Sequence, residues 1–177
     1  FIQIRMIKSF IAAIAVATCC IGNIPSAEAV TRQQFVERLQ RIGVTLVSNE
    51  CDGSFGYYQP DTNVMCINQE LFTEEKLSLF DETITHEAVH TIQDCLNGFQ
   101  EPTLVSLLNW ATEQGWKTAA LKQYMNVNID SSYIDYVNGM PKGELRNAEI
   151  EAYTLEKDSD LVYQMLSSMC IERPAGR

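Results

Sequence analysis

The sequence predicts an α+β fold, with a small sheet or meander in the first half of the chain and helices in the second half. Turn-forming residues are concentrated between positions 51 and 68, around short segments that are typical of strands. From residue 73 onward the pattern is helical, and Gly or Asn-Gly marks the ends of the expected helices. The 177 residues are 46% hydrophobic, which is a globular composition that suits one domain.

The first 29 residues have the pattern of a secretory signal peptide. A short basic stretch at Met6–Lys8 precedes a twelve-residue apolar run, Phe10–Ile21, and the small-residue signal Ala27-Glu28-Ala29. The run is too short to cross a bilayer, which needs roughly 20 residues. We expect cleavage after Ala29, export to a periplasmic or extracellular space, and one mature domain at residues 30–177. An N-terminal core helix is the alternative interpretation.

The chain is acidic, with 13 Lys and Arg against 23 Asp and Glu and a formal net charge of −10. It has no cluster of basic residues, so neither nucleic acid nor an anionic membrane surface is expected as a partner. After the expected leader no apolar run approaches the length of a membrane span, so stable membrane insertion is not expected either.

Four cysteines follow the expected leader, and an even number in an exported chain indicates two disulfides. Of the three possible connectivities we favour Cys51–Cys66 with Cys95–Cys170, the first of which would staple the turn-rich segment. A zinc site is the alternative, but none of the four cysteines has C-x-x-C spacing.

The first expected helix follows Thr31, which can serve as its N-cap, and runs to about Arg41. Residues 44–47 are a strand candidate. The turn-rich segment after them predicts a hairpin or meander with arms at residues 56–58 and 63–67.

A long helix is expected next. It begins at a capping box, Ser78–Asp81, and ends at Leu96, where Asn97-Gly98 supplies the stop. Pro102 suits the first turn of a further helix that ends near Gly115. The remaining expected helices are, in order, residues 116–125, residues 131–137, a stretch that starts after residue 143, and a last one from about residue 161, with a bend between residues 156 and 161.

The candidate chemistry is concentrated in the long helix. The two histidines of the chain lie four residues apart, in the sequence His86-Glu87-Ala88-Val89-His90. Residues at this spacing share one helical face, so both imidazoles can reach one ion and supply two of the three protein ligands of a catalytic Zn²⁺. Glu87 lies at the edge of that face, where it can take a proton from a zinc-bound water.

The residues around this motif favour a buried active-site helix. The flanking segments Thr83–Thr85 and Thr91–Ile92 are uncharged and contain no proline. Gln93 and Asp94 follow one turn after His90, where either can orient a ligand imidazole or simply end the helix well. The alternative interpretation of the motif is a pair of ordinary core or surface histidines.

Residues 83–92 resemble the active-site helix of zincin metallopeptidases. The metzincin branch of that family has a third histidine six residues after the second, and Leu96 stands there. The resemblance therefore implies a carboxylate from a later helix, as in gluzincins. Residues 146–153 are similar to the E-x-x-A-D helix of gluzincin peptidases, which places the third zinc ligand at Glu149.

The resemblance also bears on the neighbours of Glu149. Tyr153 stands where the family pattern has an aspartate that supports a ligand histidine. It can instead stabilise the oxyanion of the transition state, or serve only as a packing residue. Glu151 is the alternative third ligand, and because residues 149 and 151 lie roughly 200° apart around a helix, only one of them can face the metal. Residues 156–160 are expected to be a solvated face.

Zincins also place an edge strand just before the active-site helix, and the substrate backbone pairs with it. The resemblance assigns this role to residues 63–68, with an ordinary internal strand as the alternative. The substrate-binding residues expected there are Asn63, Val64, Met65 and Ile67.

The sequence thus predicts an exported, single-domain, Zn²⁺-dependent peptidase of gluzincin-like architecture that acts on a peptide or protein. His86, His90 and Glu149 would hold the metal, and Glu87 would be the general base. Two other classes remain open. One is a catalytically inactive zincin-fold binding module, and the other is a metal-free helical protein stapled by disulfides.

Overall fold

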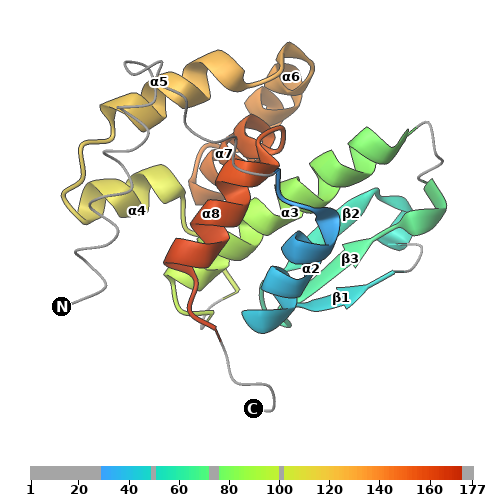
Figure 1. The fold of residues 1–177 in the computed structure, drawn as a ribbon. Coiled ribbons are helices and arrows are strands. Elements are labelled where there is room, and N and C mark those ends of the chain that lie inside the picture. Colours follow the sequence, from blue (N-terminus) through green and yellow to red (C-terminus); the bar gives the residue numbers. More distant parts are fainter. Residues whose placement is uncertain (1–28, 49–50, 72–75, 100–101, 173–177) are drawn as a thin grey trace, which may run out of the picture.

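The computed structural model describes residues 29–48, 51–71, 76–99 and 102–172. It consists of a small sheet built from the early part of the chain and a mostly helical second half, which confirms the predicted α+β class (Figure 1). The expected leader lies outside the described residues, apart from Ala29. In the described ranges, no helix combines the length and the apolar character that crossing a membrane would require.

The sheet is mixed and has the strand order β1-β3-β2. Strand β1 (Thr45–Val47) runs parallel to β3 (Val64–Ile67), and β2 (Gly56–Gln59) pairs with the other side of β3 in an antiparallel register. The predicted strand at residues 44–47 and the predicted hairpin are therefore confirmed.

The strand order corrects the expected substrate-binding strand. β3 lies in the centre of the sheet, so its backbone N–H and C=O groups already pair with two neighbours. It cannot offer a free edge to a substrate, and β2 is the edge strand that borders α3. The expected edge position is therefore wrong for the strand that carries Val64, Met65 and Ile67 and directly follows Asn63.

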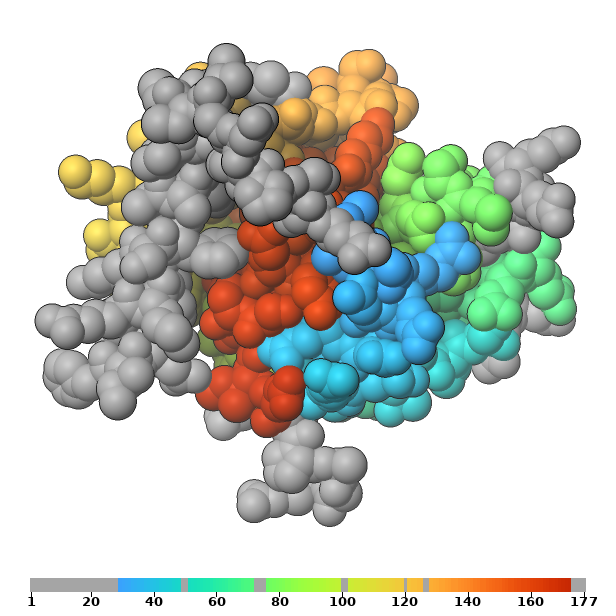
Figure 2. All heavy atoms as spheres, viewed as in Figure 1, coloured from blue at the N-terminus to red at the C-terminus, as the bar shows by residue number. Residues whose placement is uncertain are grey.

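Helix α2 (Arg32–Arg41) begins after Thr31, whose side chain forms a capping box with Gln34, as expected for an N-cap. Its apolar side packs against α8 (Ser159–Met169), where the ring of Phe35 lies 6.1 Å from the ring of Tyr163. The space-filling view shows the two helices in contact along this side, α2 in blue and α8 in orange-red (Figure 2).

Helix α3 (Leu77–Leu96) carries the histidine motif and passes between the sheet and helices α7 and α8 (Figure 1). It begins before Ser78, with Lys76 as N-cap and no side-chain cap, so the predicted capping box does not form. The predicted stop is confirmed: Gly98 has a φ of 79°, a conformation open to glycine, and its N–H bonds to the carbonyl of Cys95.

The core of the molecule forms around α3. Every residue from Ile84 to Asp94 is buried, so this helix meets protein on all sides over three turns. A helix buried all round needs an uncharged surface or partnered polar groups. The apolar side chains of largest volume that are almost completely buried are Leu39, Ile42, Met65, Val89, Ile92, Leu155, Val162 and Leu166.

The helix predicted to start at Pro102 starts later. α4 (Leu107–Glu113) has Ser106 as its N-cap, and the Ser106 side chain accepts a hydrogen bond from the N–H of Asn109. The glutamates of a later helix also bind this N-terminus, which fixes the start of α4 at Leu107. The other helices are α5 (Ala119–Asn128), α6 (Ser131–Gly139) and α7 (Glu144–Leu155).

Both predicted disulfides are present. Cys51–Cys66 has a Cα–Cα distance of 5.8 Å and Cys95–Cys170 one of 5.7 Å. The second bond requires the chain to turn back after α7, and the predicted bend is present: α7 ends at Leu155, and Asp158 caps α8 by accepting a hydrogen bond from the N–H of Leu161. Two disulfides are typical of an oxidising compartment.

Candidate metal centre

His86, His90 and Glu149 come together on the facing sides of α3 and α7. One ligand atom from each lies within 4.8 Å of the others. The Nε2 atom of each histidine is 3.6 Å from a different oxygen of Glu149. Two ligands of one tetrahedral zinc ion, each about 2.1 Å from the metal, are about 3.4 Å apart. The three side chains therefore fit a single ion with a small adjustment.

Small residues allow the two helices to approach this closely. Ala88 on α3 and both Ala148 and Ala152 on α7 are completely buried. A larger side chain at any of them would push the helices apart and carry Glu149 away from the imidazoles.

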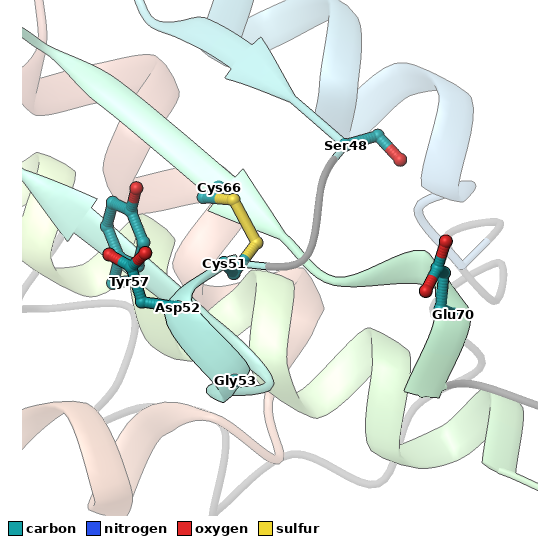
Figure 3. Close-up of a pocket in the computed structure, with 7 residues that line it drawn as sticks. All are labelled: Ser48, Cys51, Asp52, Gly53, Tyr57, Cys66 and Glu70. Atoms are coloured by element: carbon teal, nitrogen blue, oxygen red, sulfur yellow. A yellow bond between two sulfur atoms is a disulfide. The ribbon is translucent and has the colours of Figure 1, made fainter.

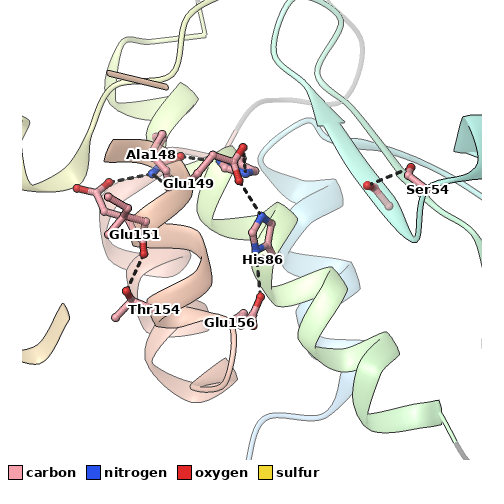
Figure 4. A network of polar contacts seen from close by, with 11 residues as sticks. Ser54, His86, Ala148, Glu149, Glu151, Thr154 and Glu156 are labelled. Atoms are coloured by element: carbon pink, nitrogen blue, oxygen red, sulfur yellow. Dashed lines mark hydrogen bonds and ion pairs between the residues drawn. The ribbon is translucent and has the colours of Figure 1, made fainter. Parts of the chain in front are cut away.

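Glu151, the alternative third ligand, faces away from the histidines. In Figure 4 its carboxylate points to the opposite side of α7 from Glu149. It accepts hydrogen bonds at the N-terminus of α4 from the hydroxyl of Ser106 and the N–H groups of Leu107 and Leu108. The roughly 200° separation expected on a helix is thus realised, with Glu149 on the side of the imidazoles.

Each histidine is oriented by a hydrogen bond at its other ring nitrogen. Nδ1 of His86 is 3.0 Å from Oε2 of Glu156, and Nδ1 of His90 is 2.8 Å from Oε1 of Gln93. Both partners are acceptors, so Nδ1 carries a proton in each ring, and Nε2, which faces Glu149, is the nitrogen that remains for a metal when the ring is neutral. This is the tautomer that a metal-binding imidazole needs.

Gln93 contacts His90 as the prediction that it can orient this imidazole requires, whereas Glu156 was expected on a solvated face and is only 5% exposed. Glu156 lies seven residues after Glu149, almost two helical turns, so both carboxylates project toward α3. That spacing is the signal in the sequence. It could not be interpreted without knowing that α7 crosses α3 along this face.

The electrostatics of the group suit a cation. Burial lowers the pKa of His86, but hydrogen bonds to Glu149 and Glu156 and the negative charges nearby outweigh it and raise the pKa to about 9. Burial and the charge of His86 lower the pKa of His90 to about 4. Burial raises the pKa of Glu149, yet the two histidines hold it below its ordinary value. The group therefore draws a positive charge into a buried position.

Glu87 is buried beside this group, on the side of α3 that faces β2. Burial raises its pKa to about 7, against the opposing effects of His86 and of a hydrogen bond from the backbone of Tyr58. The hydroxyl of Tyr58 in turn donates to Asp94 over 2.6 Å, which ties β2 to α3. Glu87 is thus held at the boundary between the metal-ligand group and the edge strand.

A cavity of about 530 Å³ opens over these residues. One wall is the edge strand β2, and the opposite wall is formed by tyrosines from α6 and α7. At Gly56 the strand approaches α3 so closely that a Cβ there would lie 2.8 Å from Cγ2 of Thr83. The charged residues that line the cavity, apart from the histidines, are Glu82, Glu87, Glu149 and Glu156.

Tyr153 belongs to the tyrosine wall. Its ring lies edge-on against His86, with centroids 4.5 Å apart, and stacks on Tyr133 at 4.0 Å. Burial and the neighbouring carboxylates raise its pKa well above the ordinary value, so the phenol keeps its proton. Its role in stabilising an oxyanion stays a prediction.

A second cavity, of about 570 Å³, lies beside the Cys51–Cys66 disulfide (Figure 3). Asp52 and Glu70 stand at its rim, and no histidine lines it. None of the predicted metal ligands is part of it.

No protein-family model matches this chain, and no curated protein or solved structure matches it either. The structure shows a buried His-His-Glu group that could hold a metal ion, within an α+β fold that has two disulfides. The resemblance to zincins therefore rests on the sequence motifs.

Proposed function

We propose that the protein is a zinc-dependent peptidase. The observation that carries this proposal is the convergence of both imidazole Nε2 atoms and the Glu149 carboxylate at one side of an open cleft, with the buried carboxylate of Glu87 next to them. A Zn²⁺ ion bound by these ligands would lower the pKa of a bound water to about 7 and polarise a substrate carbonyl.

Glu87 would act as the general base. It would accept a proton from the attacking water and deliver it to the nitrogen of the leaving amine. A pKa raised by burial to about 7 suits a group that must both take up and release a proton near neutral pH. Tyr153, as a protonated phenol in contact with His86, would donate a hydrogen bond to the oxygen that becomes negatively charged.

The edge strand β2 would position the substrate. An extended peptide that adds to β2 would lie along the cleft, between this strand and the tyrosine wall, with its backbone beside Glu87. The role that the sequence resemblance gave to the strand at residues 63–68 is thereby transferred to Gly56–Gln59.

Metal analysis of the purified protein, produced without a polyhistidine tag, tests the first step. We expect one zinc per chain, and we expect the zinc to be absent from the His90→Ala variant. A peptide-library digest read by mass spectrometry, with and without a chelator, tests the second step. Bound zinc without cleavage would favour an inactive binding module, and the absence of any metal would favour a metal-free disulfide-stapled protein.

A further inference from the structure

A chain of hydrogen bonds leads from His90 to the N-terminus of α4. Nδ1 of His90 donates to Oε1 of Gln93 over 2.8 Å, and Nε2 of Gln93 donates to Oε2 of Glu151 over 2.8 Å. The same amide nitrogen also donates to the backbone carbonyl of Ala148, at 3.0 Å. Gln93 is completely buried and Glu151 is 1% exposed, so solvent cannot replace these partners.

The orientation of the Gln93 amide is fixed by its two acceptors. A carboxylate and a carbonyl both require the NH₂ group on their side, which leaves the oxygen of Gln93 facing His90. The oxygen accepts and cannot donate, so the proton of the imidazole must sit on Nδ1. The lone pair of Nε2 is then left for the metal.

We propose that Glu151 is a positioning residue of the metal centre: through Gln93 it holds His90 in the tautomer that can bind a metal ion. This inference goes beyond the proposed peptidase activity but rests on the same His86, His90 and Glu149 group. It also assigns a role to the glutamate that the sequence offered only as an alternative ligand.

The donors around Glu151 show why a carboxylate is needed there. Four groups donate to it: the Ser106 hydroxyl, the N–H groups of Leu107 and Leu108, and the amide of Gln93. A carboxylate accepts all four with two oxygens, whereas a glutamine side chain offers one acceptor and one donor group. Leu107 and Gln93 share Oε2, so an NH₂ group at that position would face two donors.

The change Glu151→Gln would therefore act on His90 at a distance. Gln93 can remove its own part of the donor clash by turning its amide over, at the cost of its hydrogen bond to the Ala148 carbonyl, and this places its NH₂ group opposite Nδ1 of His90. The imidazole proton then moves to Nε2, and that nitrogen can no longer bind a metal without losing it. The alternative orientation of the new glutamine leaves the N–H of Leu108 facing an NH₂ group.

Glu144→Gln is the matched control. Glu144 also binds the N-terminal region of α4, through the N–H of Ser106 and the side chain of Asn109. No hydrogen bond to Gln93 is recorded for it among the described residues. If Glu151→Gln only loosened α4, its effects on the His90 tautomer and on zinc affinity would match those of Glu144→Gln. If it breaks the hydrogen-bond chain from Glu151 through Gln93 to His90, the two variants should differ.

The test has two readouts on the disulfide-bonded protein made without a polyhistidine tag. The first is the ¹⁵N NMR spectrum of the imidazoles near pH 7 in the metal-free protein, where only two histidines contribute. We expect His90 as the Nδ1-H tautomer in the wild type and in Glu144→Gln, and a shift toward the Nε2-H tautomer in Glu151→Gln. The second is the zinc dissociation constant by chelator competition, which should rise about 10–100-fold in Glu151→Gln alone.

Gln93→Met keeps the proposal testable if Glu151→Gln fails to fold, because methionine fills a similar volume and removes the acceptor. It should weaken zinc binding by a similar factor. An unchanged His90 tautomer and zinc affinity in Glu151→Gln or Gln93→Met would overturn the proposal, as would equal losses in Glu151→Gln and Glu144→Gln. If the wild type bound no zinc, the proposed function would fail, while the metal-free tautomer would still decide this inference.

Discussion

Oε2 of Glu156 accepts a hydrogen bond of 3.0 Å from Nδ1 of His86, while the other oxygen of the same carboxylate is buried without a hydrogen-bond partner in the described part of the chain. A buried carboxylate with so little compensation destabilises a fold. Its place here is explained by what it does to His86: α7 holds the imidazole from both edges, with Glu149 at Nε2 and Glu156 at Nδ1.

Removal of this support should weaken the metal site. We expect Glu156→Ala to raise the zinc dissociation constant about 10–100-fold, because His86 loses the acceptor that fixes its tautomer and ring orientation. Glu156→Gln retains one acceptor oxygen and should show a smaller loss. Competition with a chelator of known affinity measures both. Equal affinities for wild type and Glu156→Ala would show that His86 needs no such support.

Glu87 should be needed for hydrolysis and not for metal binding. It is outside the ligand group, so Glu87→Gln should keep one zinc per chain. Glutamine cannot accept the proton, and turnover should fall by about 10²–10⁴-fold. Glu82→Gln is the matched control, since Glu82 lies five residues earlier on α3 and lines the same cavity. Normal turnover by Glu87→Gln would refute the proposed mechanism.

The close approach of β2 to α3 gives a third prediction, at Gly56. A methyl group there would meet Cγ2 of Thr83 at 2.8 Å and the carbonyl oxygen of Cys66 at 2.9 Å. Gly56→Ala should push the edge strand off the helix, lower the free energy of unfolding by about 1–3 kcal/mol, and reduce cleavage.

Two further variants control this experiment. Gly139→Ala should be close to neutral, since nothing lies within 4 Å of a Cβ at that position. Adding Thr83→Ser to Gly56→Ala removes one of the two short contacts and should restore part of the stability. Chemical denaturation and peptide cleavage measure the series, and a fully stable, fully active Gly56→Ala would mean that β2 does not need this approach.

Metal affinity should depend steeply on pH. A zinc-bound imidazole must be neutral, and in the metal-free protein the pKa of His86 is raised to about 9, so binding has to displace a proton at neutral pH. Zinc affinity should therefore rise about tenfold per pH unit between about pH 6 and pH 8, and level off above the pKa of His86.

The variant Glu156→Gln tests whether the raised pKa of His86 causes this pH dependence. It removes one of the negative groups that raise the pKa of His86, so the levelling should begin at a lower pH. Chelator competition across this range, corrected for protonation of the chelator, gives the slope. A flat profile in the wild type would contradict the assignment of His86 as a ligand that is protonated in the metal-free state.

The sequence predicted those parts of the site that depend on local periodicity. The spacing of His86 and His90 places them on one face of any helix, and the buried α3 follows from the uncharged residues around them. Glu149 came from a one-turn resemblance, and its preference over Glu151 from helical geometry. Each of these predictions uses only the geometry of a single helix, which sequence spacing determines.

The other parts depend on how elements cross, which local sequence does not determine. Glu156 gains its role only because α7 runs along α3, and Glu151 only because the N-terminus of α4 meets the far side of α7. The strand order is of the same kind: nothing in residues 63–67 distinguishes a central strand from an edge strand until β1 adds to it in parallel. The start of α4 is a further example: the sequence predicted it at Pro102, and tertiary contacts place it at Leu107.

The Cys95–Cys170 disulfide should stabilise the fold without defining the metal site. It closes a loop with a sequence separation of 75 and contributes about 4 kcal/mol in the chain-entropy model. Cys95 lies five residues beyond His90, about 8 Å along α3. Gln93 and its buried partner Glu151 together orient the imidazole of His90, and they do so independently of the disulfide.

The double variant Cys95→Ala/Cys170→Ala should therefore unfold at a lower denaturant concentration and still bind one zinc with near-normal affinity while it is folded. The matched double variant Cys51→Ala/Cys66→Ala opens a loop with a sequence separation of only 15. It should lower the free energy of unfolding by less, about 3 kcal/mol. Denaturation curves of the metal-free proteins give the stabilities, and chelator competition gives the affinities. A folded Cys95→Ala/Cys170→Ala protein that has lost its zinc would show that the end of α3 must be tied to α8 for His90 to reach the metal.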